Sequence, residues 1–415
     1  MIIMNFNNTL PVILSLIPLV FGAVWKLSNG KFTTHKSMGL VAIVVLAGGL
    51  VYMQSAFESE ASMLLLASAI LLSAFCAIIS QDNTQEALAT HASIMIVLGL
   101  SMGVLLNQEI VSRVFLCGLL GLIATSLNRK QHNTYRTKII FLHIILAIIF
   151  SLGSAFVEED LQMFSGLFLA VTFLPLAPFH LPFVGRIKDA KESLSSFWIV
   201  VWIIIGLGEL NRIYSGLTTE MLFILSLLAL ISAVYASLAA LGQRFNSLFV
   251  ASATVAHVAL IWGLLEVFPG FHKWGISFGI TLAFVMGGIS LAFSFIRKRY
   301  GWKTLGILPG LASPMPRLGV AMVLLVSFAL FLPLFPIFSG LIDMPTIVNS
   351  NIEIGMVSFL ILVVWLGGGW YFIQMLHQTA FGEARSDVPY SDLRLTEFVA
   401  VSALLLGAAY SGMIH

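Results

Sequence analysis

The chain has 415 residues, of which 59% are apolar and only 10% are charged, and its mean hydropathy is +1.00. This composition excludes a soluble globular domain and indicates an integral membrane protein. The net charge of +2 says little about partners, because the charged residues fall between the apolar runs. Cys76 and Cys117 lie inside apolar runs without disulfide or metal-site spacing. The sequence has no CxxC, Walker or GxGxxG motif, so we expect no cofactor and no metal.

Fourteen apolar runs approach or reach the roughly 20 residues that a helix needs to cross a bilayer. The links between them are short, so we expect one all-α, polytopic membrane domain over residues 1–415, with about fourteen transmembrane helices. The break NQEIVSR, between the fourth and fifth runs, is the least secure boundary. The runs cover approximately residues 10–25, 38–53, 62–80, 92–107, 110–127, 138–156, 161–179, 194–210, 219–241, 247–268, 275–296, 317–341, 354–376 and 395–413.

Basic residues concentrate in alternate loops. The odd-numbered loops hold 18 of the 21 lysines and arginines, and the even-numbered loops hold only Arg113, Arg212 and Lys273. Cytoplasmic loops collect Lys and Arg. We therefore expect a multi-pass protein of the cell inner membrane, with the odd loops in the cytoplasm and both termini outside.

The stretch over residues 172–213 contains the most unusual corner in the chain. An apolar helix runs into Pro175 and Pro178 and is expected to break at Phe179–His180, before a short basic loop. Proline lacks the backbone donor that a helix interior needs, and an unpaired carbonyl is costly in hydrocarbon. Protein or water must hold this corner. It is therefore either a candidate ion site or a plain helix end with a tight turn.

A second interruption falls in the twelfth run, FALFLPLFPIFSGLIDMP. Pro333, Pro336 and Gly340 are expected to break this helix at membrane depth. Interrupted helices often mark ion pathways, because freed carbonyls and half-helix ends can coordinate a charge. A kinked packing helix is the alternative interpretation.

Four segments, in this order and spacing, resemble the antiporter-like membrane subunits: LPLAPFHLPF, QRFNSLFVASATVAHVALIWGL, LGILPGLASPMPRLGVAMVLLVSFALFLPLFP and WYFIQMLHQTAFGEARSDVPYSDLRLTEF. That superfamily includes the proton-pumping subunits of respiratory complex I, the large Mrp antiporter subunits and the membrane subunit of DAB-type inorganic carbon pumps. The resemblance spans roughly residues 90–413. It implies a fourteen-helix antiporter-like fold with outward termini, and ion movement within a larger complex.

The resemblance is incomplete where the pumping members carry protons. Those members have a glutamate in the fifth helix, in a pattern like FWELxxLxSYLL, and Gly118 stands at the corresponding place here. Their broken-helix lysine corresponds to a position near Ile204, and a later lysine corresponds to Ser247. The stretch FWIVVWIIIGLG contains no lysine at any register. The usual lysine–glutamate relay is therefore in doubt.

A few ionisable side chains remain inside the apolar runs. His257 matches the histidine of the family's SSxxHxG pattern and lies mid-helix, where it either relays protons or caps a neighbouring carbonyl. His180 matches the histidine of the PFHxW pattern at the helix corner. Glu209 and Arg212 lie three apart on one helix face, so Glu209 either serves an ion pathway or pairs with Arg212 at the outer interface. The candidate ion-pathway residues are His257, His180, Glu209, Pro333 and Pro336.

Two functions follow from these residues. In one, the chain conducts protons or sodium and couples the flow to a partner's reaction. In the other, it is a degenerate antiporter-like subunit of a complex I-like or Mrp-like complex and serves as a membrane anchor or as a subunit of an NADH-quinone oxidoreductase. Loss of the acid and the lysines favours the anchor, whereas His257, His180 and the interrupted twelfth run favour conduction. No nucleophile, metal set or acid pair converges, so we expect no enzymatic activity from this chain alone.

The missing lysine relay also bears on the choice of complex. It argues against an ordinary complex I pumping subunit and favours, by family analogy, a DAB-type pump. In that scheme an antiporter-like chain pairs with a large cytoplasmic zinc protein resembling a β-carbonic anhydrase, and proton flow drives hydration of CO2 to bicarbonate. The expected partners are thus other subunits of a membrane complex and the lipid bilayer, with no nucleic acid.

Overall fold

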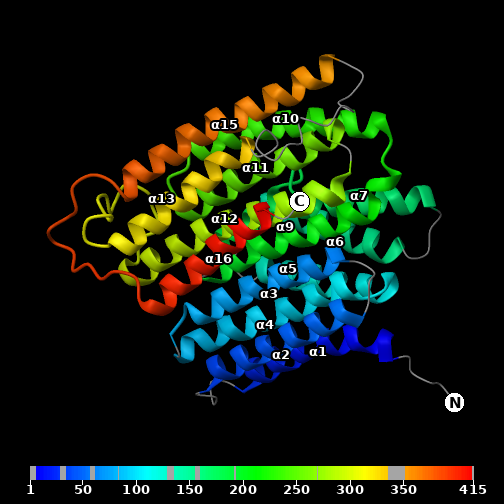
Figure 1. Ribbon diagram of the computed structural model, residues 1–415, viewed down its shortest axis with the longest axis horizontal. Coiled ribbons are helices and arrows are strands. Elements are labelled where there is room, and N and C mark those ends of the chain that lie inside the picture. Colours follow the sequence, from blue (N-terminus) through cyan, green and yellow to red (C-terminus); the bar gives the residue numbers. More distant parts are fainter. Residues whose placement is uncertain are drawn as a thin grey trace.

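A computed structural model describes residues 6–28, 34–56, 61–82, 84–128, 135–154, 159–190, 193–268, 270–334 and 351–413. Over these residues the protein is all-α, as the sequence predicts, and its helices pack side by side in one bundle (Figure 1). The helices are α1 (Phe6–Leu27), α2 (His35–Ala56), α3 (Ala61–Ile79), α4 (Gln85–Leu106), α5 (Glu109–Asn128), α6 (Tyr135–Gly153), α7 (Glu159–Phe173), α8 (Leu181–Asp189), α9 (Ser193–Ile213), α10 (Thr219–Leu241), α11 (Asn246–Val267), α12 (Phe271–Tyr300), α13 (Pro316–Phe331), α15 (Asn351–Thr379) and α16 (Leu395–Met413).

The described helices follow the predicted apolar runs, and the predicted count of about fourteen membrane helices is approximate. Twelve described helices are long and apolar enough to span a bilayer, and α6 and α7 contribute two shorter apolar helices. Each of these fourteen helices overlaps one predicted run, so the chain is a multi-pass membrane protein. The insecure boundary NQEIVSR is confirmed, because α4 ends at Leu106 and α5 begins at Glu109.

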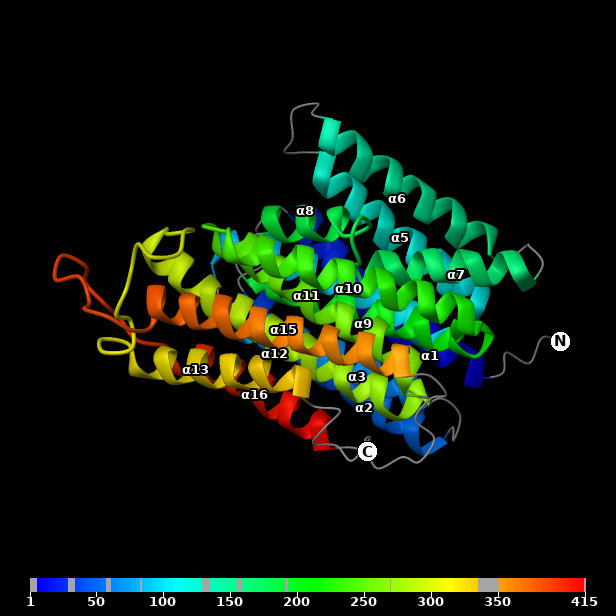
Figure 2. The same ribbon diagram turned by 90° about the horizontal axis from the view of Figure 1, so that it is seen from above.

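Three helices form the centre of the bundle (Figure 2). In the most apolar 18 residues of each helix, all residues of α9 and α12 and 94% of those of α11 are buried inside the protein. In α1, α2, α15 and α16 the buried share is only 33%. Apolar side chains on these outer helices face the bilayer at no cost, since lipid tails are as apolar as leucine. Polar groups on α9, α11 and α12, by contrast, must find partners inside the protein.

Helices α1 and α4 show how close packing is achieved without a hydrophobic driving force. A Cβ atom on Gly22 would lie 2.7 Å from the carbonyl oxygen of Ala92, and one on Gly99 would lie 2.7 Å from that of Ser15. Only glycine permits backbones to approach so closely, which is the usual device for helix association in membranes. A larger residue at either position would separate the two helices.

The first proline corner differs from the prediction in two ways. Helix α7 ends at Phe173 rather than near residue 179, because Pro175 disfavours helical geometry in the residue before it. The expected basic loop is also mostly helical. Residues Leu181–Asp189 form α8, which begins with a proline in its first turn and buries Phe183 and Ile187. Proline suits a helix start because the first N–H groups have no intrahelical partner.

The second interruption begins where the sequence predicts it. Helix α13 ends at Phe331 and passes into a short 3-10 turn at Leu332–Leu334, in which Pro333 is buried. Pro336 and Gly340 lie outside the described residues.

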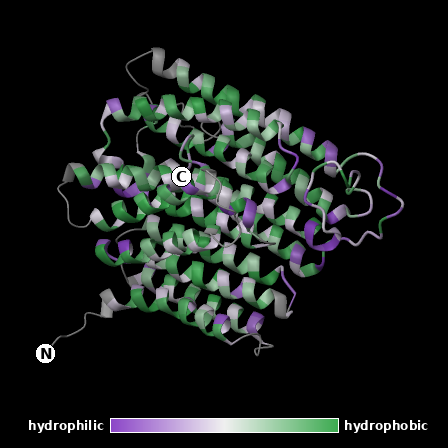
Figure 3. Cartoon of the chain, turned by 180° about the vertical axis from the view of Figure 1, so that it is seen from behind, coloured by the Kyte–Doolittle hydropathy of each residue, from purple (hydrophilic) through white to green (hydrophobic). Residues whose placement is uncertain are grey.

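Charged side chains gather at the two ends of the bundle, and apolar residues cover the helices between them (Figure 3). At the end formed by the odd loops, Asp82 pairs with Lys298 at 2.9 Å and also with Arg394, while Arg299 pairs with Glu397. The hydrogen bond from Lys298 holds the pKa of Asp82 below its ordinary value. The basic odd loops thus converge on one face, although which compartment that face meets stays a prediction.

Cysteine labelling tests the orientation. In a variant without the native cysteines, we expect a cysteine at Ser313 to react only with reagent on the cytoplasmic side, and one at Ser215 only with reagent outside, because both side chains are exposed at opposite ends of the bundle. Probes at Asn133 and Ser59, which lie outside the described residues, should follow Ser313 and Ser215, respectively. Labelling of Ser313 from outside would reverse the predicted topology.

Candidate ion-pathway site

His257 of α11 meets the interruption of α13. Its Nε2 lies 3.2 Å from the carbonyl oxygen of Ala329. Ala329 stands four residues before Pro333, which has no N–H, so this carbonyl lacks the usual helical donor. Because an unsatisfied carbonyl in hydrocarbon costs several kcal/mol, the bond from His257 stabilises the break. The capping role that the sequence left open for His257 is therefore present in the structure.

Trp262, on the same helix, binds a backbone carbonyl at the other interruption. Its indole Nε1–H donates a 3.0 Å hydrogen bond to the carbonyl oxygen of Leu174, just beyond the end of α7. Leu174 lies beyond Phe173, the last residue of α7, so its carbonyl has no donor from a following helical turn. One helix, α11, thus satisfies a freed carbonyl at each of the two proline interruptions.

Neighbouring helices complete the first corner. Trp202 of α9 donates to the carbonyl oxygen of Thr172 at 2.8 Å, and the N–H of Ala177 donates to Ser232 of α10 at 2.7 Å. Gly206 allows α9 to pass close to this corner, because a Cβ atom there would lie 2.7 Å from the backbone nitrogen of Leu174. The corner is held by protein groups on several sides.

Hydrogen-bond acceptors lie beside both ring nitrogens of His257. The side chain is fully buried, its Nδ1 lies 2.9 Å from the carbonyl oxygen of Ala253, and the Tyr371 hydroxyl lies 3.2 Å from the same nitrogen. A neutral ring with its hydrogen on Nε2 can donate to Ala329 and accept from Tyr371. Protonation at Nδ1 adds a donor that can bind the carbonyl of Ala253. The site can therefore hold a proton without leaving either ring N–H unpaired.

Glu209 lies in a different environment. It is fully buried, and its carboxylate accepts hydrogen bonds from Arg212 at 2.6 Å and from Arg113 of α5 at 2.5 Å. The predicted pairing with Arg212 is confirmed, but the pair is buried rather than exposed at the interface. Arg113 is also not a loop residue: it lies inside α5 with only 5% of its side chain exposed. Arg212 additionally donates to the carbonyl oxygen of Val104 at 2.6 Å.

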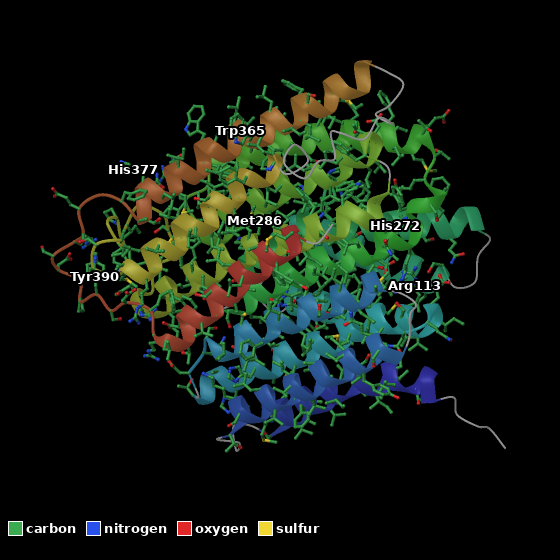
Figure 4. All side chains as sticks on the ribbon, in the orientation of Figure 1. Arg113, His272, Met286, Trp365, His377 and Tyr390 are labelled. Atoms are coloured by element: carbon green, nitrogen blue, oxygen red, sulfur yellow. The ribbon has the colours of Figure 1, made fainter. Side chains whose placement is uncertain are left out.

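A polar pocket of about 760 Å³ lies beside this ion-pair cluster, at the end of the bundle opposite Tyr390 (Figure 4). Its polar lining side chains include Asn107, Gln108, Glu109, Arg113, Gln162, Asn211 and Arg212. Glu209 is sealed from this pocket by the two arginines. A carboxylate held by two guanidinium groups is a poor proton carrier, because both hold it in the charged form.

The remaining candidates are distributed around the bundle. His180 directly precedes α8 and packs its ring 5.2 Å from that of Tyr235. The structure brings His257 and Pro333 together through the Ala329 carbonyl, places His180 and Glu209 elsewhere, and does not describe Pro336. Within the described residues, no group of three or more His, Cys, Asp or Glu side chains is arranged to hold a metal ion.

Sequence reasoning did not assign site roles to Arg113, Trp262 or Tyr371. Trp262 lies five residues after His257, and the only available signal was a tryptophan with a polar N–H in the middle of an apolar run. Arg113 lies four residues after Glu109 at the start of an apolar run, a spacing that indicates a helical ion pair.

No protein-family model matches the chain. The F(420)H(2) dehydrogenase subunit M of Methanosarcina mazei is 25% identical over 328 residues, which cover 74% of this chain and 61% of that protein. The NADH-quinone oxidoreductase subunit M of Rickettsia felis is 23% identical over 252 residues, covering 58% of this chain and 50% of that protein. The chain thus spans between half and about three fifths of these curated relatives.

Solved structures give a clearer result for the fold. A chain of respiratory complex I from Thermus thermophilus superposes with a TM-score of 0.73 at 16% identity, over 95% of this chain and 94% of that chain. The chain has the fold of a complex I membrane subunit. A chain of the membrane-bound sulfane sulfur reductase, an archaeal respiratory membrane complex, has the same fold with a TM-score of 0.75 at 15% identity, over 95% of this chain and 74% of that one. The complex I membrane-subunit fold agrees with the resemblance found in the sequence.

Proposed function

We propose that this chain is a membrane subunit of an ion-translocating, respiratory-type complex, in which other subunits carry the catalytic chemistry. The support comes from the fold and from the names of its relatives, which are M subunits of an F(420)H(2) dehydrogenase and of an NADH-quinone oxidoreductase. These relatives favour the respiratory interpretation over the inorganic carbon pump. No feature of the described site favours CO2 or bicarbonate chemistry over ion movement.

The observation that carries a conducting role is the contact between His257 and the carbonyl freed by Pro333. His257 is the twelfth of the 22 residues of α11, so it lies near the middle of a membrane-spanning helix. A proton crossing the bundle needs a group that binds and releases it. An ionisable side chain at such a depth is costly, which makes it a candidate for that role. In our proposal the proton resides at Nδ1, with Ala253 as acceptor, and Tyr371 accommodates both states.

A purely structural role is the second candidate, and a specific observation favours it. Gly118 and Ile204 stand where pumping members are expected to carry a glutamate and a lysine, and Glu209 is locked between Arg113 and Arg212. The two hydrogen bonds from α11 would then serve only to make the bundle rigid. Substitutions at His257 distinguish the two roles, as argued in the Discussion.

Co-purification tests the choice of complex. We expect the tagged full-length chain, extracted in mild detergent, to bring down further membrane subunits together with a redox subunit that carries flavin or iron–sulfur clusters. Recovery of a large zinc protein resembling a β-carbonic anhydrase, in place of a redox subunit, would restore the carbon-pump interpretation. Recovery of the chain alone under conditions that preserve membrane complexes would contradict both.

A further inference from the structure

A pocket of about 340 Å³ opens at the end of the bundle formed by the odd loops, and the ion-pathway proposal does not use it. It lies among the end of α8 and the following Ala190, the first part of α9, the start of α11, and α12 with the loop after it. Its lining residues are Lys188, Asp189, Ala190, Ser195, Phe245, Asn246, Ser247, Leu248, Val250, Ser290, Phe293, Ser294, Arg297 and Lys303.

Three basic side chains from separate segments converge on this pocket. Lys188 comes from α8, Arg297 from the last turn of α12 and Lys303 from the loop after α12, and Asp189 is the single carboxylate among the lining residues. The described ion pairs include neither Lys188 nor Lys303. Even without Arg297, the two lysines outnumber Asp189, so the described lining carries an excess of positive charge.

Other basic residues at the same end are arranged differently. Lys298 and Arg394 pair with Asp82, and Arg299 pairs with Glu397. Their charges are neutralised by carboxylates across neighbouring helices. The excess of positive charge at the pocket is thus a local feature and does not simply reflect the basic composition of this end.

Backbone hydrogen bonds hold Lys303 beside the start of α11. The N–H of Asn246 donates to the carbonyl oxygen of Lys303 at 2.9 Å, and the N–H of Leu305 donates to that of Arg244 at 2.8 Å. Phe245, the residue before α11, provides no side-chain cap. The amide dipoles of the first turn of α11 therefore add to the positive potential at the pocket, as at other helix N-termini that bind anions.

The floor of the pocket supplies hydroxyl and amide groups. The hydroxyl oxygens of Ser195 and Ser290 lie 3.0 Å apart and share a hydrogen bond, and Ser294 lies one turn further along α12. Asn246 is only 8% exposed, and its Oδ1 has no hydrogen-bond partner in the described part of the protein. A ligand that combines anionic oxygens with a hydroxyl donor satisfies such a lining. Phe245 and Phe293 add apolar surface for an organic portion.

We propose that this pocket, with its lining residues Lys188, Arg297, Lys303, Asn246 and Ser195, is a binding site for a phosphate-bearing anion. Lysine and arginine form charge-assisted hydrogen bonds with phosphate oxygens, and these are roughly twice as strong as neutral ones. The volume falls at the lower end of the range of about 300–1,000 Å³ typical of small-molecule sites. A phosphate group on a soluble ligand and one on an anionic lipid share this chemistry.

Thermal unfolding with matched variants tests the proposal. The full-length protein in detergent is titrated with sodium phosphate against sodium chloride at equal ionic strength, and separately with phosphatidylglycerol against phosphatidylcholine. The pocket variant is Lys188→Gln with Lys303→Gln, because both side chains are exposed and neither belongs to a described ion pair. The control is Lys298→Gln with Arg385→Gln, which removes the same charge from exposed residues at the same end but outside the pocket.

We expect phosphate or phosphatidylglycerol to raise the unfolding midpoint of the native and control proteins, because a ligand that binds only the folded state stabilises it. The pocket variant should lose most of this shift, with an affinity reduced at least about tenfold, which corresponds to 1.4 kcal/mol. A shift with phosphate identifies a soluble ligand, and a shift with phosphatidylglycerol alone identifies a lipid. An equal shift in the pocket and control variants, or no shift in the native protein, would overturn the proposal.

Discussion

Replacing Glu209 with glutamine is expected to destabilise the protein by about 3–5 kcal/mol, the usual cost of removing one partner from a buried ion pair. The substitution leaves the shape of the side chain almost unchanged. It removes, however, the one negative charge of the described residues that lies within 3 Å of both Arg113 and Arg212, and both arginine side chains are largely buried. The cost arises mainly from the two arginines, which then keep only the Glu109 carboxylate at 3.8 Å from Arg113 and the Val104 carbonyl oxygen at 2.6 Å from Arg212.

Glu109 provides the matched control for this substitution. Its carboxylate lies 3.8 Å from the same Arg113, but 47% of its side chain is exposed. Exposed pairs contribute only about 0–1 kcal/mol, so Glu109→Gln should leave the unfolding midpoint nearly unchanged. Thermal unfolding of the purified variants in detergent measures the difference. Equal unfolding midpoints for Glu209→Gln and Glu109→Gln would contradict this prediction. They would mean that burial does not determine how much each carboxylate contributes to stability.

Replacing His257 with glutamine is expected to separate structure from conduction. A glutamine amide can still donate a hydrogen bond to the Ala329 carbonyl, but it cannot bind and release a proton near neutral pH. We therefore expect normal assembly with the partner subunits. Ion-coupled activity in proteoliposomes should fall by about 100-fold, the scale on which a positioned proton-transfer group contributes. His257→Ala should lose the cap as well, and with it about 1–3 kcal/mol of stability.

Trp262→Phe is the control for the loss of a cap alone. It removes the N–H bond to the Leu174 carbonyl at the other interruption and leaves every titratable group in place. We expect it to lower the unfolding midpoint while the assembled complex keeps its ion-coupled activity. Full activity of an assembled His257→Gln complex would remove the relay hypothesis and leave the structural role. If Trp262→Phe and His257→Gln lose activity equally, both losses would be explained by weaker packing at the helix interruptions and not by loss of a proton carrier.

The apolar helices and the two proline interruptions could be predicted because hydrocarbon imposes strong local rules. A spanning segment needs a run of apolar residues, and a proline removes a backbone donor wherever it occurs. These rules act on neighbours in the chain, so the ends of α4 and α5 and the break before Pro333 follow from the sequence. Helix α8 was missed because its nine residues mix basic and apolar side chains and are too short to span the bilayer.

The partners of the buried polar groups could not be predicted in the same way. Arg113 and Glu209 are 96 residues apart in the chain, and His257 and Ala329 are 72 apart. Sequence periodicity places each residue on a face of its own helix but does not say which helix packs against that face.

The sequence by itself therefore determined the membrane environment, the helices and the sites where backbone hydrogen bonds are broken, since each depends on local composition. The tertiary structure alone decided that α11 caps both interruptions and that Glu209 is shared by two arginines. The physical reason is that a freed carbonyl or a buried charge in a bilayer must find a partner inside the protein. Helix packing over long sequence separations selects that partner.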